Sequence, residues 1–504
     1  MLVGAAAFVI AVGVALYVVR PFHTGTLGYD AAASILYFDR LMAGRHLEAF
    51  LGATPKPLLT VTYGLVHSVA PDWRAISWLA ILAYGTGIAT SAVLAHRLGG
   101  IIAAGFVTAA LIGSAELLQD VDLAYAVSWA LIFWSAAGLL VTSARPRYAW
   151  AGVALALAGL ARFETLIVTG SAALILGLGF VAARSQTRDA HWVRARVPIL
   201  LGFLTLPVQG VHDWLLTGDP LYSESVPVLS SAGLHLPGVA GVLGAIGAHY
   251  AAEPILLLLA LLGMLTLWGR SPDVAAGVIA LVVGVLLFLV YLASRGIYVS
   301  DRYIAPVDVG LTFAASLGVA SIRFRSLARR VRAIRLRAAA PILAAAGGAV
   351  IAVAVIRPFG PLDRPTRSDV TFNGIFHRDL ERLTPVILES LGGRSGLPSF
   401  PDDGTATTHT GSRAILLAPV LAVPQLSLDL DLPLSAITGT QGPLVTTDGR
   451  YPQPGQLLLH YIGRDDPESA FRLFEVRSPT TRGAIAIDPV EVDPAGRFWL
   501  VRIR

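Results

Sequence analysis

The 504-residue sequence contains no cysteine and few charged residues. Without cysteine, the chain cannot form disulfides, zinc–thiolate sites or thiol nucleophiles. Charged residues make up 14% of the chain, compared with about 25% in a typical soluble domain. Glycine-rich phosphate loops and the short motifs of zinc and serine hydrolases are also absent. Nucleotide-driven pumping and these two kinds of hydrolysis therefore have no motif support.

Lysine is almost missing too, since Lys56 is the only one and the remaining cationic side chains are arginines and histidines. The formal net charge is +5. The arginines gather in short gaps between apolar runs, as positive residues do on the cytoplasmic side of membrane proteins. Membrane topology explains the basic character better than binding of nucleic acid does, and we expect no nucleic-acid partner.

Long apolar runs are what the sequence has in excess. It is 55% hydrophobic, with a mean hydropathy of +0.67. A membrane-spanning helix needs about 20 mostly apolar residues. About eleven such segments are expected, with 148–161 rather short: 2–19, 75–95, 100–117, 123–142, 148–161, 164–183, 197–215, 252–269, 273–293, 303–320 and 339–356. The stretch Leu58–Val69 is too short to cross, and we expect it to lie at the membrane interface.

Arginine placement predicts the orientation of these segments. Most arginines of the bundle fall on alternate loops, which we assign to the cytoplasm: Arg145, Arg147, Arg184, Arg188, Arg194, Arg196, Arg270 and the run from Arg323 to Arg337. The loops 20–57, 116–122, 217–250 and 294–302 then lie outside, together with everything after 357. The prediction is a multi-pass plasma-membrane protein whose site faces the extracytoplasmic side.

The composition shifts after Pro358 towards Pro, Gly, Asp, Thr and Ser. A helix is expected at Phe376–Leu391 and a turn at Asp448-Gly449. The same region contains three strand-like apolar runs: Ala414–Val423, Gln456–Tyr461 and Phe498–Ile503. The predicted fold class is therefore an all-α polytopic membrane bundle over 1–356, with a small soluble α+β domain over 357–504.

The first outer loop places Asp30 just beyond the first apolar segment. An amphipathic stretch with apolar Ile35, Leu36, Phe38 and Leu41 follows it. A carboxylate at a membrane boundary beside apolar groups is a candidate general base. Aspartate is also a favoured helix N-cap, and this structural role explains Asp30 equally well.

Lys56 stands between Pro55 and Pro57, and proline fixes the backbone on either side of it. A stiffly presented ammonium at the membrane surface suits a lipid phosphate as a point charge. The alternative is a lysine that extends its charge to the interface at the start of a helix. A single lysine in a chain that otherwise uses arginine favours the phosphate role.

Two further loops carry candidate residues for the sugar and the acceptor. Glu116, Asp120 and Asp122 suit an acceptor hydroxyl or one divalent cation, although a solvated loop explains them as well. Arg162 and Glu164 fall between two apolar runs, where they either line a polar cavity or form an ordinary turn. Charges within membrane segments favour the cavity.

Later loops add candidates for the phosphate and the sugar. Arg295 and Arg302 offer planar guanidinium groups that suit a phosphate, and Tyr303 follows directly. Tyr222 ends the segment Gly218-Asp219-Pro220-Leu221-Tyr222. An interfacial belt of Tyr and Arg is the alternative explanation for residues 295–303.

Several of these motifs occur in an order that resembles one superfamily. These are Tyr29-Asp30 and Ala43-Gly44 in the first loop, Pro55-Lys56-Pro57-Leu58, Leu160-Ala161-Arg162-Phe163-Glu164, Gly218-Asp219-Pro220-Leu221-Tyr222 and Arg302-Tyr303. Together they resemble the membrane-embedded GT-C glycosyltransferases over about the first 320 residues. This superfamily includes protein O-mannosyltransferases, the lipid A aminoarabinose transferase, and mannosyl- and arabinofuranosyltransferases of actinobacterial envelopes.

The resemblance implies an inverting transferase that takes its sugar from a polyprenyl-phosphate donor. It implies that Asp30 is the base on the acceptor, which would be an envelope glycan, lipid or protein. Metal use stays open, because Tyr29 and Ala31 flank Asp30 where a second acidic residue is frequent in the superfamily. The arginine bias indicates a high-GC genome, in which actinobacterial cell-wall chemistry is a natural guess.

Two other classes of function are compatible with many helices. A secondary transporter or lipid flippase would place its charges near the bilayer midplane in paired halves, and no paired halves are visible. A non-catalytic envelope scaffold would use the bundle only to anchor the C-terminal domain. Such a scaffold would keep its role without the carboxylate of Asp30, whereas a transferase would lose it.

Overall fold

We describe the fold from a computed structural model of the chain. It describes residues 2–19, 28–47, 54–182, 187–231, 238–297, 299, 303–322, 340–355, 380, 382–391, 416–419, 423–430, 437–441, 445–446, 457–461, 487–492 and 498–503. Among the residues singled out above, those outside these ranges include Arg184, Arg302, the run from Arg323 to Arg337 and the predicted turn at Asp448-Gly449.

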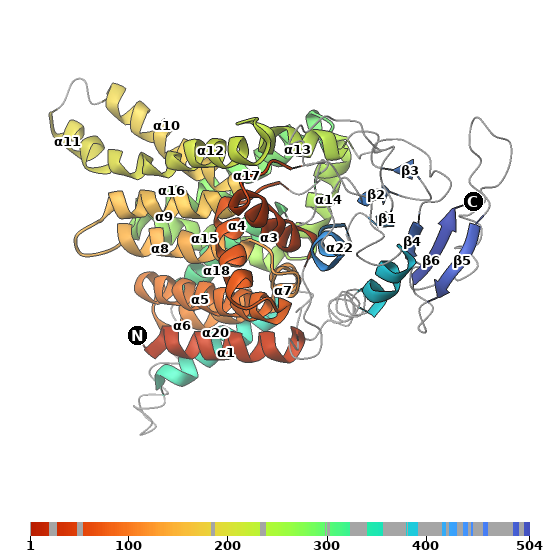
Figure 1. Cartoon of the computed structure of the whole chain (residues 1–504). Coiled ribbons are helices and arrows are strands. Elements are labelled where there is room, and N and C mark those ends of the chain that lie inside the picture. Colours follow the sequence, from red (N-terminus) through yellow and green to blue (C-terminus); the bar gives the residue numbers. More distant parts are fainter. Residues whose placement is uncertain are drawn as a thin grey trace.

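Each of the eleven predicted segments contains an apolar helix (Figure 1). Four helical stretches are long and apolar enough to cross a membrane alone: Trp73–Gly99, Phe163–Val181, Trp192–Thr217 and Pro272–Ser294. Two bent pairs raise the number to six: Ile101–Gly113 with Ala115–Asp122, bent by 59°, and Val239–Ala251 with Pro254–Arg270, bent by 87°. Five more are shorter: Leu2–Val18, Val127–Val141, Tyr148–Ala161, Ala305–Ser321 and Pro341–Val355. The number of crossings stays a prediction.

Small residues bring several of these helices very close together. In α15 (Pro254–Arg270) and α18 (Ala305–Ser321), a Cβ added at Gly263 would collide with the carbonyl of Ala314. In α6 (Ile101–Gly113) and α20 (Ala340–Val355), one added at Gly105 would collide with the carbonyl of Ala345. Helices in membranes associate through such small-residue contacts, so this packing fits the predicted membrane bundle.

The remaining helices of the bundle join these elements. Those before Ala182 are α1 (Leu2–Val19), α5 (Trp73–Gly99), α7 (Ala115–Asp122), α8 (Val127–Val141), α9 (Tyr148–Ala161), η1 (Phe163–Thr165) and α10 (Leu166–Ala182). Those after it are α11 (Thr187–Arg196), η3 (Val197–Leu204), α12 (Thr205–Thr217), α13 (Tyr222–Ser231), α14 (Val239–Ala251), α16 (Pro272–Ile279), η4 (Ala280–Gly284) and α17 (Val285–Ser294).

The first predicted outer loop contains two helices, on its amphipathic stretch and on the short apolar stretch after Lys56. Helix α3 (Tyr29–Met42) begins after Gly28, whose N–H donates to the Leu123 carbonyl at 2.9 Å. Helix α4 (Pro57–Val69) has Pro57 in its first turn, where a missing N–H costs nothing. The helix expected at Leu58–Val69 is therefore present, and α3 packs directly on α4.

The described strands at the C-terminal end pair in the order β3-β2-β1-β4-β6-β5. They are β1 (Leu416–Pro419), β2 (Ile437–Gln441), β3 (Val445–Thr446), β4 (Leu457–Tyr461), β5 (Ile487–Val492) and β6 (Phe498–Ile503). β1 runs parallel to β2 and β4, and β6 runs antiparallel to β4 and β5. Residues 382–390 are helical. This helix and β1, β4 and β6 fall on the predicted runs, whereas β2, β3 and β5 do not. The α+β domain and its boundary at 357 stay predictions.

The C-terminal elements share a core with α3. Leu36 and Tyr37 of α3 belong to one buried cluster with Leu426 of α22 (Val423–Leu430), Leu416 and Leu457. Figure 1 shows α3, α7 and α22 at the end of the bundle that faces the strands, and α11 at the opposite end. The acidic loop residues and the arginine-rich helix α11 thus occupy opposite ends of the bundle.

Candidate active site

Asp30 and Lys56 form an ion pair across the two helices of the first loop. Asp30 lies in the first turn of α3, and Lys56 directly precedes α4. The Nζ of Lys56 donates to Oδ2 of Asp30 at 2.9 Å, with the lysine side chain 21% exposed and the aspartate 17%. The two residues that the sequence analysis assigned to base and phosphate therefore face each other at a partly open position.

Asp30 does not act as the N-cap of α3. That position is Gly28, and it makes no side-chain hydrogen bond to the helix. A carboxylate in the first turn is still favoured by the helix dipole. The capping explanation for Asp30 is thus replaced by an ion pair, which leaves the general-base hypothesis in place.

A buried polar network from α12 holds the Lys56 segment. Gln209 Nε2 donates to the Pro55 carbonyl at 3.1 Å and contacts Asp213 Oδ1 at 2.8 Å. Asp213 also accepts from the N–H and hydroxyl of Ser223, both at 2.9 Å. Both the prolines and this network restrain the segment. The backbone from which the Lys56 side chain extends is therefore held in place.

Arg162 and Glu164 form a second ion pair between α9 and α10. Arg162 Nη2 donates to Glu164 Oε1 at 2.9 Å, and each side chain is 8% exposed. The Cζ of Arg162 lies 6.0 Å from the centroid of the Tyr303 ring. Lys56 interacts electrostatically with Glu164, and Asp120 does so with Arg162. The pair connects the first loop with α7 and the start of α18.

The three acidic residues of the second loop take different surroundings. Asp120 Oδ2 accepts from the N–H of Val127 at 3.1 Å, and both Asp120 and Asp122 are buried. Glu116 instead approaches His249 and Asp308, and one ligand atom from each of these three residues lies within 4.8 Å of the others. Among the described residues, the candidate ligand atom of Glu116 thus groups with His249 and Asp308 rather than with Asp120 and Asp122.

Tyr222 approaches the first loop through Tyr37. Tyr37 of α3 is buried, and burial together with nearby Tyr222, Tyr29 and Asp30 raises the pKa of its hydroxyl well above the ordinary value. Tyr222 packs against the cluster that α3 shares with the C-terminal elements. It therefore lies beside the wall of the candidate site.

Of the two predicted phosphate-binding arginines, Arg295 makes no contact with Asp30 or Lys56 within the described residues. Arg295 is exposed at the C-terminal end of α17, and Arg302 lies outside the described residues. Lys56 supplies a cationic contact to Asp30 in the described part of the chain.

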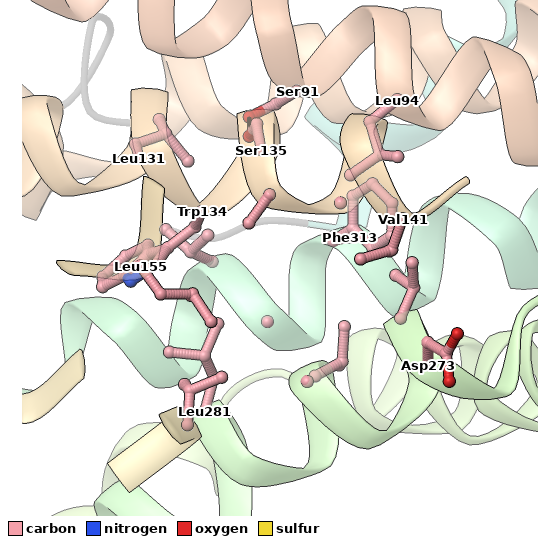
Figure 2. Close-up of a pocket in the computed structure, with 18 of the residues that line it drawn as sticks. Ser91, Leu94, Leu131, Trp134, Ser135, Val141, Leu155, Asp273, Leu281 and Phe313 are labelled. Atoms are coloured by element: carbon pink, nitrogen blue, oxygen red, sulfur yellow. Dashed lines mark hydrogen bonds between the residues drawn. The ribbon is translucent and has the colours of Figure 1, made fainter. Parts of the chain in front are cut away.

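An apolar cavity of about 120 Å³ lies within the bundle (Figure 2). Figure 2 shows Leu131, Trp134 and Phe313 around it, with Asp273 at one end. Trp134 donates to the Thr165 hydroxyl at 3.1 Å, next to Glu164. Asp273 is held by Arg196 at 3.0 Å. The cavity therefore extends from the arginine-rich end towards the charged groups around Glu164.

His249, Asp308 and Gln209 were missed by the sequence analysis. Asp308 had a usable signal, because a lone carboxylate inside an apolar segment is a functional hypothesis by default. His249 and Gln209 had none, since each gains its meaning only from residues at least 59 positions away or from a backbone carbonyl.

Comparison with known proteins shows the class of fold and no sequence family. Neither the protein-family models nor the curated protein sequences give a match. Among solved structures, the chain has the fold of GT-C membrane glycosyltransferases, as its motifs predicted. With its apolar helices, this fold makes it a multi-pass membrane protein.

Two of the similar structures are ArnT from Cupriavidus metallidurans and the archaeal oligosaccharyltransferase AglB from Archaeoglobus fulgidus. ArnT in the apo state is 15% identical, with a TM-score of 0.57 over 98% of this chain and 97% of ArnT. ArnT bound to undecaprenyl phosphate is 16% identical to this chain, with a TM-score of 0.56. AglB in complex with an inhibitory peptide and a dolichol-phosphate is 12% identical, with a TM-score of 0.53 over 85% of this chain and 64% of AglB.

Proposed function

We propose that the protein is an inverting glycosyltransferase that moves a sugar from a polyprenyl-phosphate donor to an acceptor hydroxyl outside the cytoplasm. The ion pair between Asp30 and Lys56 in a GT-C fold carries this proposal. The fold similarity to ArnT, which has been solved with undecaprenyl phosphate, and to AglB, solved with a dolichol-phosphate, supports the lipid-phosphate donor. The acceptor is an envelope glycan, lipid or protein.

In this mechanism Asp30 is the general base. The acceptor oxygen attacks the anomeric carbon while its proton passes to the Asp30 carboxylate. The bond from that carbon to the phosphate oxygen breaks on the opposite face, and the polyprenyl phosphate leaves with the electron pair. A base that is 17% exposed is open to an acceptor while partly shielded from water.

Lys56 holds the donor phosphate in the proposal. Its ammonium is positioned by Pro55 and by the Gln209 network, so a phosphate bound to it would place the reacting carbon close to Asp30. Neutralising the charge that develops on the departing phosphate lowers the barrier most when the cation is already in position. Arg302 and Arg295 are proposed as additional phosphate ligands.

The sugar and acceptor are proposed to lie among Asp120, Asp122, Arg162, Glu164, Tyr303 and Tyr222, with Glu116 at the edge. The buried ion pair at Arg162 and the hydroxyl groups around Tyr37 are the observations that support this location. Hydrogen bonds to sugar hydroxyls from fixed groups orient the anomeric carbon.

We expect Asp30→Asn to reduce transfer by about 10²- to 10⁴-fold, the usual contribution of a general base. Transfer would be measured with purified protein, labelled polyprenyl-phosphate sugars and envelope extracts as acceptors. Lys56→Met is expected to lower the transfer rate on the order of 10²-fold. Lys56→Arg should recover part of that rate, because the positive charge returns.

Asp72→Asn is the matched control, because Asp72 is an exposed aspartate at the start of another helix, α5. This variant should transfer sugar as the wild type does. Unchanged transfer by folded Asp30→Asn would place the base elsewhere. If the folded wild type transfers sugar from none of the donors, the proposal is wrong and a transporter or an envelope scaffold becomes the better explanation.

A further inference from the structure

Glu116, His249 and Asp308 come from three segments that are far apart in the sequence. Glu116 lies on α7, His249 on α14 and Asp308 on α18. Their ligand atoms lie within 4.8 Å of one another, and all three side chains are partly buried. Two partly buried carboxylates repel each other, and the contact of His249 Nε2 with Asp308 Oδ1 at 3.4 Å offsets only part of this repulsion when the imidazole is protonated. A bound cation would offset it at any protonation state of His249.

Hydrogen bonds from neighbouring residues orient both carboxylates. The Ser114 hydroxyl contacts Glu116 Oε2 at 3.0 Å, and the Tyr250 hydroxyl donates to Asp308 Oδ1 at 2.8 Å. Such supporting hydrogen bonds to a ligand carboxylate are typical of metal sites.

We propose that Glu116, His249 and Asp308 bind one divalent transition-metal ion. The geometry requires only a small adjustment. Ligands at about 2.1 Å from one ion lie roughly 3 to 4 Å from each other. His249 Nε2 and Asp308 Oδ1 are already 3.4 Å apart, and the Glu116 ligand atom lies within 4.8 Å of both residues' ligand atoms.

The donor set indicates the kind of ion. Imidazole nitrogen suits zinc, iron and other transition metals, while Mg²⁺ and Ca²⁺ prefer oxygen ligands alone. One histidine and two carboxylates therefore favour Zn²⁺ or Mn²⁺. Three protein ligands leave at least one coordination position for water or for a phosphate oxygen.

The proposed ion is distinct from the Asp30–Lys56 pair, yet α7 connects the two. Glu116 and Asp120 are four residues apart on that helix and so lie on the same face. Asp120 interacts with Arg162, which in turn stacks over Tyr303 near the start of α18. An ion at Glu116 would thus tie α7, α14 and α18 together beside the candidate site. Its existence does not depend on the proposed transfer reaction.

The test measures metal binding without any donor. The full-length protein is stripped with a chelator, dialysed against Zn²⁺ or Mn²⁺, and its metal content is measured by mass spectrometry. We expect one ion per chain in the wild type. Glu116→Gln, His249→Asn and Asp308→Asn should each weaken binding by about 100-fold or more, since even the loss of a supporting residue costs 10- to 100-fold.

Glu253→Gln is the matched control, because Glu253 is a carboxylate at the N-cap of α15, close in sequence to His249, and lies outside the three-residue set. It should keep the ion, and so should Asp30→Asn. The melting temperature of each stripped protein shows whether it is folded, and added metal should raise this temperature in the wild type and in both controls only. Binding that survives in all three ligand variants, or a wild type that retains no ion, overturns the proposal. Loss of the ion in Asp30→Asn alone would place the metal at the first loop instead.

Discussion

At the scale of single residues, the Arg162–Glu164 pair shows how a buried charge constrains the chain. Both side chains are 8% exposed and joined by a bond of 2.9 Å. Removing two charges from water costs several kcal/mol for each ion, and their mutual attraction repays this only while both partners are present. The pair is therefore fragile to any change that removes one member.

Arg162→Met should lower the free energy of unfolding by about 3–5 kcal/mol, because Glu164 is left buried without its cation. Glu164→Gln in the same chain should restore much of this loss by removing the unpaired charge. Thermal unfolding in detergent measures both, with Arg295→Met as the control at an exposed arginine. If Arg162→Met left the free energy of unfolding unchanged, water would already reach Glu164.

Residue-level prediction from the sequence succeeded where a residue is unusual by itself. Lys56 is conspicuous as the single lysine between two prolines, and Asp30 follows directly after an apolar run. Their contact, across 26 positions, could not be derived from spacing. The contact between His249 and Asp308 was not predictable, because the tertiary packing of α14 on the end of the bundle brings them together and no local pattern encodes that packing.

At the scale of elements, two glycines that line the apolar cavity differ in the space around them, although they look alike in the sequence. Gly277 of α16 and Gly310 of α18 both line it. A Cβ at Gly277 would meet no atom within 4 Å, whereas one at Gly310 would lie 2.8 Å from Cγ2 of Val282. Added volume therefore fills space at the first position and collides at the second.

Gly277→Leu should stabilise the protein by about 0.5–2 kcal/mol, through cavity filling and the loss of a flexible glycine from a helix. Gly310→Leu should destabilise it by about 1–3 kcal/mol through overpacking. The difference in melting temperature between the two variants is the measurement. Equal effects of the two substitutions would contradict the cavity wall described here.

Element positions were predictable because apolar length is a local property. Each of the eleven expected segments coincides with a helix, including the short one at Tyr148–Ala161. The bend of 87° between α14 and α15 was not predictable, since it occurs at Glu253-Pro254 within a stretch whose first half was expected to be a loop. That first half carries His249, so the missed helix explains the missed residue.

At the scale of the whole molecule, the distribution of charge predicts which end of the bundle faces the cytoplasm. Helix α11 has the densest arginines in the described bundle. It lies at the opposite end from α3 and α7, which carry Asp30 and Glu116 (Figure 1). Positive residues are retained on the cytoplasmic side during insertion. The candidate site and the strands should therefore lie outside, where lipid-linked sugars replace cytoplasmic nucleotide sugars as donors.

Because the chain has no cysteine, single cysteines can test this orientation without any background. Leu221→Cys and Glu389→Cys introduce exposed thiols at the predicted outer end and in the C-terminal region, and Arg145→Cys does so at the arginine-rich end. In intact cells, a membrane-impermeant maleimide should label the first two variants and leave Arg145→Cys unlabelled. After permeabilisation, all three should react equally, which shows that each thiol is accessible. Labelling of Arg145→Cys alone in intact cells would invert the topology and place the Asp30–Lys56 pair in the cytoplasm, where a nucleotide sugar would become the more natural donor.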